Sequence, residues 1–502
     1  MASRIGDLAR HTGVYGLGTI VGGLSRAALV PIIARYVPAE EYGKASMILI
    51  FITLFTIVSE LGLSSSLIKF VNEAPDRARR REVVSTVLAT TLLLAVPLAV
   101  LCALLAGRLS NLFLGSAAYG SLVLIGVAGG LGNAILQVGL SFERALARSA
   151  RYVLYTLMKG VLALGLSVIL VIAFRKGAYG LLLGAAVPPL LIGAVIYGRL
   201  VSRFAIRFSR SVFRNIFTFG SPLVPMNLAI WVLTYSDIYL LRKLSTPTGA
   251  LTEVGLYQYA HEICLILVLP ITSLNLAWPQ FLFANHSKPG ASETFARVHL
   301  YFSYFLLMMA FLLAAFAGGI IGLVGSAQYE GSSGVIPYLA GSLVFYGFSV
   351  IFSSGLYVAG RTRILAGVVT GCAVLNVILN ILLIPRMGKE GAAAATFATN
   401  VVMALTVLAF SQTGYRIPFK LGRTLSGVLL GVAGVAALAR WDASGPGQGM
   451  LLRVLVSAGF SVALFGLLGL KGRDLKAAIT VAGSILRPGS HAGDRPDRVI
   501  DI

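Results

Sequence analysis

Residues 83–107 read VVSTVLATTLLLAVPLAVLCALLAG and contain no charged side chain. A helix that crosses the hydrocarbon core of a membrane needs about 20 apolar residues, so this stretch is long enough for one crossing. Uncharged runs of the same kind follow at 109–142, 263–287, 364–385 and 391–415. Hydrophobic residues make up 57% of the 502 residues and charged residues only 12%, whereas soluble chains carry about 25% charged residues. The sequence therefore predicts an all-α, polytopic membrane protein.

The spacing of the apolar runs predicts about fourteen membrane-spanning helices. We place them at 11–34, 43–68, 83–107, 119–141, 152–174, 177–198, 215–241, 254–284, 299–325, 335–359, 364–385, 391–413, 424–440 and 450–470. The basic residues 471–502 are predicted to form a disordered cytoplasmic tail.

The distribution of Lys and Arg predicts the orientation. The terminal segments and the loops on their side carry 28 of these residues, and the opposite loops carry ten. Because positive residues stay on the cytoplasmic side, we expect both termini to be cytoplasmic. The net charge of +22 is thus explained by orientation signals in short loops rather than by nucleic-acid binding. The three cysteines lie inside apolar runs, which argues against a disulfide framework or a metal site.

Two short motifs indicate an internal repeat. Residues 41–43 (EYG) resemble residues 253–255 (EVG) at a separation of 212, and residues 180–186 resemble 391–397 at a separation of 211. A period of six spans predicts two parallel repeats. We therefore divide the chain into an N-lobe (1–200), a basic linker (201–214), a C-lobe (215–415), two further helices (416–470) and the tail (471–502).

Motifs of soluble enzymes are absent from the sequence. It has no GxxxxGK[ST] phosphate-binding loop and no GxSxG nucleophile motif. His261-Glu262 begins like the zinc motif HExxH, but Leu265 occupies the place of the second histidine. We therefore expect neither an enzyme nor a cofactor, and coupling to a proton or sodium gradient stays open.

Charged residues inside predicted spans are the candidate site residues, because such groups are costly in a membrane and normally face protein or water. Arg26 and Glu60 lie deep in the first and second spans. Either they pair with each other, or Arg26 lines a hydrated cavity and binds an anion while Glu60 orients it.

Further candidates lie nearer the span ends. Lys159 is placed near the cytoplasmic end of the fifth span, where a lysine can extend to the interface. Asp237 is near the outer end of the seventh span, and its place in the repeat corresponds to that of Arg26. His261 and Glu262, early in the eighth span, are able to titrate or to pair with Arg242. Lys69 and Arg144, at cytoplasmic span ends, are either orientation charges or the rim of a cavity.

Short motifs around several of these residues resemble polysaccharide-exporter flippases of the multidrug/oligosaccharidyl-lipid/polysaccharide superfamily. The motifs are GLGTI at 16–20, PIIARY at 31–36, EYG at 41–43, ELGL at 60–63, KF at 69–70, YSD at 235–237 and VGLY at 254–257. The resemblance implies two six-helix lobes around a V-shaped central cavity. It also implies transport of a polyprenyl-diphosphate-linked sugar between leaflets, with cavity cations, Arg26 first, on the diphosphate. The acid at Asp237 fits the sugar-polymer branch better than peptidoglycan-precursor flippases.

Two alternatives remain. A drug/cation antiporter of the same fold favours several buried carboxylates, and only Glu60, Asp237 and Glu262 are available. An integral-membrane polysaccharide polymerase normally has a large outer loop, and the longest outer loops here are short. The resemblance implies a lipid-linked oligosaccharide and membrane lipids as partners, with polymerases and glycosyltransferases as further candidates, in a bacterial inner membrane.

Overall fold

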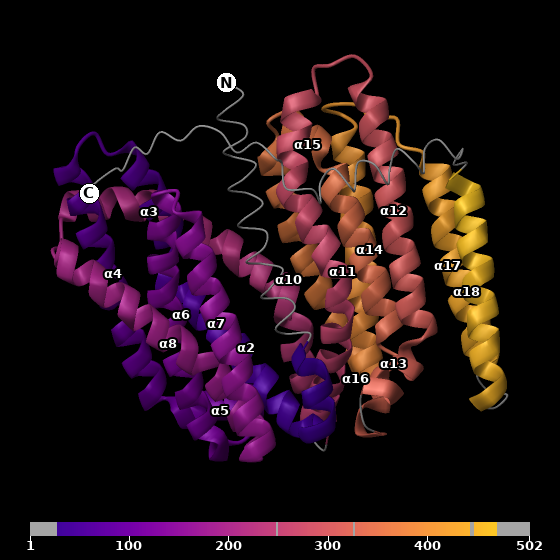
Figure 1. Cartoon of the computed structure of the whole chain (residues 1–502), viewed down its shortest axis with the longest axis horizontal. Helices are drawn as coiled ribbons and strands as arrows, with labels where there is room; N and C mark the ends of the chain where they lie inside the picture. The colour runs from indigo at the N-terminus through magenta and orange to yellow at the C-terminus, as the bar shows by residue number, and fades with distance from the viewer. Residues whose placement is uncertain (1–27, 247–248, 325–326, 442–445, 469–502) are drawn as a thin grey trace, which may run out of the picture.

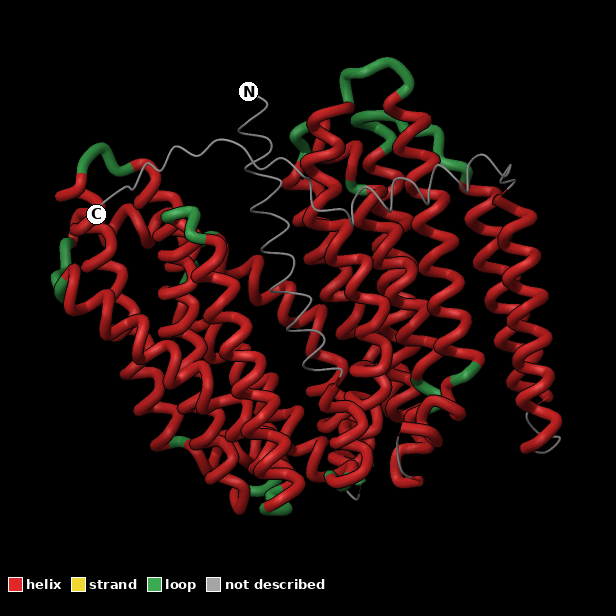
Figure 2. Tube along the Cα trace, viewed as in Figure 1, coloured by secondary structure: helices red, strands yellow, loops and turns green. Residues whose placement is uncertain are grey.

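The computed structural model of the chain describes residues 28–246, 249–324, 327–441 and 446–468. Every regular element in these ranges is helical, as Figure 2 shows, which confirms the predicted all-α class. Eleven helices of the described ranges are long and apolar enough to cross a membrane. Most of the predicted span 11–34, with Arg26, and the tail 471–502 lie outside the described residues, so the count of fourteen stays a prediction.

The N-terminal half of the described chain forms one group of packed helices, here called the first bundle (Figure 1). Its helices are α2 (Ala39–Glu60), α3 (Leu63–Glu73), α4 (Arg77–Leu104), α5 (Ala106–Leu114), α6 (Gly120–Ala145), α7 (Ser149–Val168), α8 (Gly177–Phe204) and α9 (Arg210–Gly220). The short 3-10 helix η1 (Ala117–Tyr119) precedes α6, and the π-helix η2 (Ile169–Ala173) continues α7. Helix α6 lies at the centre of the bundle and packs against α2, α4 and α8.

A second group of packed helices, here called the second bundle, follows the first along the chain. It contains α10 (Leu223–Leu244), α11 (Ala250–Asn285), α12 (Ala291–Ala315), α13 (Ala317–Val324), η3 (Ala327–Ser332), α14 (Ile336–Phe352), α15 (Ser354–Val358) and α16 (Thr362–Ser411). The predicted span 215–241 is wrong at its start, because the chain breaks at Ser221–Pro222 and residues before the break belong to the separate helix α9. Helix α11, by contrast, runs through Pro270 without interruption.

Helix α16 holds two of the predicted spans, 364–385 and 391–413, in one element of 50 residues. The two halves are separated at Gly388, whose φ of 57° and ψ of −132° are not helical. Such a conformation is readily adopted only by glycine. The halves fold back on each other, since Asn376 of the first half donates a hydrogen bond to Thr399 of the second.

The buried cores show how the two bundles are joined. One large core contains residues of both bundles, among them Phe51 and Leu122 of the first and Val254 and Leu339 of the second. Two smaller cores each belong to one bundle, residues 63–216 in the first and 278–417 in the second. The bundles therefore share a core at one end of the molecule, here called the joined end, and have separate cores at the other, the separate end.

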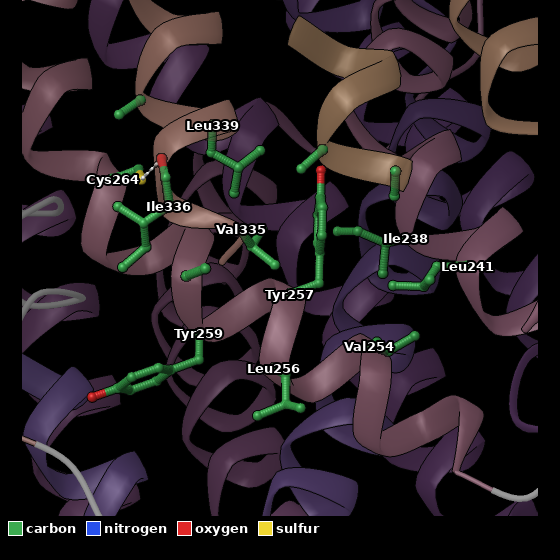
Figure 3. Close-up of a cluster of buried hydrophobic side chains, with 14 of the residues drawn as sticks. Ile238, Leu241, Val254, Leu256, Tyr257, Tyr259, Cys264, Val335, Ile336 and Leu339 are labelled. Atoms are coloured by element: carbon green, nitrogen blue, oxygen red, sulfur yellow. Dashed lines mark hydrogen bonds between the residues drawn. The ribbon is translucent and has the colours of Figure 1, made fainter. Parts of the chain in front are cut away.

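Figure 1 shows this arrangement as two bundles that approach at the bottom of the view and diverge toward the top. Figure 3 shows part of the shared core, where Tyr257 and Val254 of α11 lie near Ile238 and Leu241 of α10.

The last two helices, α17 (Leu421–Trp441) and α18 (Pro446–Leu468), pack against α12 at the edge of the second bundle (Figure 1). The rings of Phe311 and Phe460 stack with centroids 4.0 Å apart, and Tyr304 donates a hydrogen bond of 3.0 Å to the carbonyl of Arg423.

Candidate transport site

Asp237 lies within the second bundle and connects three of its helices. Its carboxylate, on α10, accepts hydrogen bonds from the hydroxyls of Tyr257 on α11 and Thr396 on α16, the latter at 3.4 Å. The residue is only 4% exposed. Within the described residues no lysine or arginine forms an ion pair with Asp237. The backbone amide of Ile238 also donates to the carboxylate, at 2.8 Å. A buried carboxylate held by hydroxyl groups and a main-chain amide, with no cation paired to it, is able to take up a proton or a small hard cation.

Neutral polar side chains extend this arrangement along α16. Ser236 donates a 2.8 Å hydrogen bond to Oδ1 of Asn376, and Asn380 donates to the same oxygen at 3.0 Å. Oδ1 of Asn380 is buried and has no hydrogen-bond partner. We call the whole set the Asp237 cluster: Ser236, Asp237, Tyr257, Asn376, Asn380, Thr396 and Thr399.

Sequence reasoning found Asp237 and missed most of its partners. The available signal was the pair of asparagines four residues apart, 376 and 380, inside an uncharged apolar run. Four residues is one helical turn, so both amides lie on one face of α16.

His261 and Glu262 lie one turn beyond Tyr257 on α11, and both are half-buried. Oε1 of Glu262 accepts a hydrogen bond of 3.1 Å from Gln258 on the same helix. Their suggested partner Arg242 points elsewhere, because its guanidinium donates to the carbonyl of Leu114 in the first bundle.

Lys159 lies near the middle of the span Ser149–Ala173, not near its end as the sequence suggested. Its ammonium donates a 3.0 Å hydrogen bond to Oδ1 of Asn133 on α6, so it is held inside the first bundle rather than extended to the interface. The Asn133 amide in turn donates to the carbonyl of Gly129. Because this partner is neutral, the positive charge of Lys159 remains available to an anion.

The remaining predicted residues lie toward the separate end. Glu60 is the last residue of α2, and Arg144 on α6 is close enough to interact with it electrostatically. Arg144 also donates to Ser141 at 2.9 Å and lies over the ring of Tyr152. Arg26 lies outside the described residues, so its pairing with Glu60 stays a prediction.

Lys69 on α3 is held by aromatic rings. Its ammonium lies 4.3 Å from the ring centroid of Phe219 on α9 and 5.2 Å from that of Phe70. This contact fastens α9 to α3.

At the joined end, the glycines of the two repeated motifs make equivalent contacts with the opposite helix. A Cβ atom at Gly43 of α2 would overlap the carbonyl oxygen of Leu251, and one at Gly255 of α11 would overlap the carbonyl oxygen of Ala39. The two pairs are related by the same separation of 212 residues. The backbones of α2 and α11 are thus in direct contact here, with no room for a side chain.

The acids of the two repeated motifs also have matching partners. Oε2 of Glu41 accepts a hydrogen bond from the backbone amide of Ala178 at 3.2 Å, and Oε2 of Glu253 accepts one from that of Lys389 at 3.3 Å. Each carboxylate thus binds the chain next to the second repeated motif of its own bundle.

Further hydrogen bonds cross between the bundles at the joined end. Arg242 donates to the carbonyl of Leu114 at 2.8 Å, and Tyr329 in η3 donates to that of Val37 at 2.9 Å. Gln328 adds bonds to Ala34 and Val37. Burial raises the pKa of Tyr329 well above its usual range, so its hydroxyl remains a donor. Side chains of the second bundle thereby bind the main chain of the N-terminal half.

Comparison with known proteins gives the following similarities. The family model described as "Polysaccharide biosynthesis protein" matches residues 8–281. An uncharacterised membrane protein of Methanocaldococcus jannaschii, MJ1068, is 25% identical over 43% of this chain and 43% of its own length. A probable low-salt glycan biosynthesis flippase of Haloferax volcanii, Agl15, is 24% identical over 55% of this chain and 63% of its own. The chain thus spans less than two thirds of either relative.

Solved structures share the fold. The lipid II flippase MurJ in an inward closed conformation has a TM-score of 0.71 at 17% identity, covering 91% of this chain and 98% of MurJ. An inward-facing multidrug transporter of the MATE family, from the MOP superfamily, has a TM-score of 0.58 at 16% identity, covering 78% and 97%.

Proposed function

Since the chain belongs to the family of polysaccharide biosynthesis proteins, we propose that it is a flippase for a polyprenyl-diphosphate-linked oligosaccharide. It moves this lipid from the inner to the outer leaflet by alternating access, and it makes and breaks no covalent bond. Agl15, which is 24% identical over 55% of this chain, is a probable flippase of glycan biosynthesis, and this similarity supports the proposal.

The observation that carries the proposal is the unequal contact between the two bundles. They share a core and several hydrogen bonds at the joined end, and have separate cores at the other end. A sugar headgroup cannot enter hydrocarbon, so it needs a polar path that is closed to one side at a time. A joined end on the outer side, with entry from the cytoplasm, corresponds to one of the two states of such a cycle.

A repeat of six spans supports the same mechanism, because alternating access needs two bodies that move against each other. The reciprocal contact of Gly43 and Gly255, and the matching bonds of Glu41 and Glu253, are what a parallel repeat at a separation of 212 requires. We accordingly keep the division into an N-lobe (1–200) and a C-lobe (215–415), with both termini cytoplasmic in a bacterial inner membrane.

The substrate is held by its diphosphate. Lys159, whose partner Asn133 is neutral, supplies one positive charge from the first bundle, and Arg26 supplies another. The Asp237 cluster in the second bundle is the place where a proton or sodium ion couples transport to a gradient. Polymerases and glycosyltransferases are the enzymes that consume and supply such a substrate.

An antiporter for cationic drugs is the second candidate, and the buried carboxylate of Asp237 is the observation that favours it. The two functions differ in the charge of the ligand. An anionic lipid diphosphate needs Lys159 and Arg26, whereas a cationic drug needs Asp237 and is repelled by Lys159.

The first prediction tests the ligand role of Arg26. The full-length protein is reconstituted in vesicles with a fluorescent polyprenyl-diphosphate oligosaccharide, and transfer between leaflets is measured by quenching. Charge-assisted hydrogen bonds contribute about 1.5–3 kcal/mol, so Arg26→Ala should slow transfer at least about tenfold. Arg26→Lys should recover only part, because lysine lacks the planar fork.

The double variant Arg26→Ala/Glu60→Ala separates the two readings of this pair. If Arg26 only neutralises Glu60, removing both leaves no unpaired charge and transfer returns. If Arg26 binds the diphosphate, the double variant folds and remains slow. Recovered transfer in the double variant would contradict the ligand role, and no transfer by the unmodified protein would contradict the proposed function.

A further inference from the structure

The segment that connects the two bundles is strongly basic and carries no acid. Between Glu143 and Asp237 the sequence contains no aspartate or glutamate. Five arginines recur within it every three or four residues, and all five side chains are exposed: Arg199, Arg203, Arg207, Arg210 and Arg214. No ion pair in the described part of the chain includes any of them.

Large apolar side chains are exposed between these arginines and just after the last of them. Ile206 is 48% exposed, Phe208 51% and Phe217 46%. They lie outside the candidate spans, between Gly177–Phe204 and Leu223–Leu244, so the hydrocarbon core does not account for their exposure. The rings of Phe208 and Phe217 both pack on Phe213, with centroids 5.3 and 5.7 Å from it. Arginines interleaved with exposed apolar groups are typical of a surface that lies in the headgroup layer of a membrane.

We infer that residues 199–217 bind the anionic headgroups of phospholipids in the surrounding leaflet, with the arginines on the phosphates and Phe208 and Phe217 inserted between the lipids. This inference goes beyond transport and does not depend on which glycan is carried.

Contacts with the first bundle fix the position of residues 199–217. Val212 and Ile216 of α9 are buried in the core of that bundle. The carbonyl of Ile216 accepts a 3.2 Å hydrogen bond from Ser66, and the amide of Ser209 donates one of 3.3 Å to Thr86. Because α9 is fixed, little order has to be gained when lipids bind, which favours binding.

The position of the segment selects the partner. Helix α8 ends at Phe204 immediately before it, and α10 begins at Leu223 immediately after it. Both helices are candidate spans, so the surface lies where they leave the membrane, within reach of lipid headgroups. Guanidinium groups bind phosphate oxygens in a bidentate way, and neutral headgroups without net negative charge leave the five charges uncompensated.

The experiment uses the full chain in nanodiscs of phosphatidylcholine, with and without phosphatidylglycerol. The number of bound phosphatidylglycerol molecules is measured by native mass spectrometry, and the thermal midpoint of unfolding is measured in the same discs. The test variant is Arg203→Gln/Arg207→Gln/Arg210→Gln. Each arginine near an anionic surface contributes about 1 kcal/mol, so the variant should bind phosphatidylglycerol about 100-fold more weakly.

The control variant Arg175→Gln/Lys176→Gln/Lys243→Gln removes the same charge from the opposite ends of α8 and α10. It should keep both the bound lipid and the rise in thermal midpoint that phosphatidylglycerol produces. Equal lipid binding by the two variants would overturn the inference, because net charge alone would then explain the result. If the test variant does not fold, a salt titration of the unmodified protein decides: lipid binding that does not weaken with salt overturns the inference as well.

Discussion

Asp237 is a single residue whose chemistry can be tested apart from the fold. Replacement by Asn keeps the volume and one acceptor oxygen, and the hydroxyls of Tyr257 and Thr396 can rotate to accept from the new amide. We expect Asp237→Asn to stay folded and to lose the dependence of transport on an imposed proton or sodium gradient. Gradient-driven transfer in vesicles and the thermal midpoint of unfolding are the two measurements.

Asp237→Leu should behave differently, because it removes the carboxylate that accepts from the buried hydroxyl of Tyr257 and the half-buried hydroxyl of Thr396. An unpaired buried polar group costs about 1–3 kcal/mol, so a clear drop in thermal midpoint is expected. Glu330→Gln, at an exposed acid in η3, is the control and should change neither quantity. If Asp237→Asn transports with an unchanged gradient dependence, the coupling ion does not bind at this residue.

The bend between the two halves of α16 can be tested by substitution. Its two halves separate at Gly388, where the positive φ and the neighbouring carboxylate of Glu253 leave no comfortable place for a side chain. Gly388→Ala should cost about 1–3 kcal/mol, because a non-glycine residue is strained in that conformation. Gly367→Ala, on the same helix with open space at its Cβ position, should stabilise the protein by about 0.5–1 kcal/mol.

Thermal unfolding of both α16 variants in the same detergent or nanodisc gives the comparison. If the thermal midpoint shifts by the same amount and in the same direction in both variants, the conformation at Gly388 does not require a glycine. The bend matters to the site as well, because it brings Asn376 and Thr396 side by side.

The contact of the two bundles is a property of the whole molecule. A methyl group at Gly43 or Gly255 overlaps the main chain of the other bundle, so either substitution should force the joined end apart. Spin labels at Arg108 and Lys243, both exposed and one in each bundle, report the separation by pulsed electron paramagnetic resonance. Gly43→Ala and Gly255→Ala should lengthen the distance or broaden its distribution.

Gly198→Ala is the matched control, because the Cβ position at Gly198 of α8 meets no atom within 4 Å. The distance should be unchanged in this variant. A distance that also stays unchanged in Gly43→Ala would mean that the joined end accommodates the methyl group, and that the glycine pair does not set the spacing of the bundles.

The helices and the charged candidate residues could be predicted from the sequence for a physical reason. Apolar length predicts a span, and a charge inside a predicted span is conspicuous, which is why Asp237, Glu60 and Lys159 are candidates. Asn133, Asn376 and Thr396 were missed, because neutral polar residues are ordinary in such runs and only the folded chain brings them to a charge. The bonds of Arg242 and Tyr329 were also beyond prediction, since their acceptors are main-chain carbonyls that leave no mark in the sequence.

The tight seat of α9 has a mechanical consequence. The main chain at Gly220 meets that of Leu61 and Gly62 so closely that neither glycine has room for a Cβ. Helix α9 is thus fixed to the first bundle, and only Ser221 and Pro222 separate its end at Gly220 from the start of α10 at Leu223. If one bundle rotates against the other, this connection has to follow by rotation about the few backbone bonds of Ser221 and Pro222, and the proline ring fixes φ of Pro222. In the proposed transport cycle, this joint of two residues therefore limits how far one bundle rotates against the other.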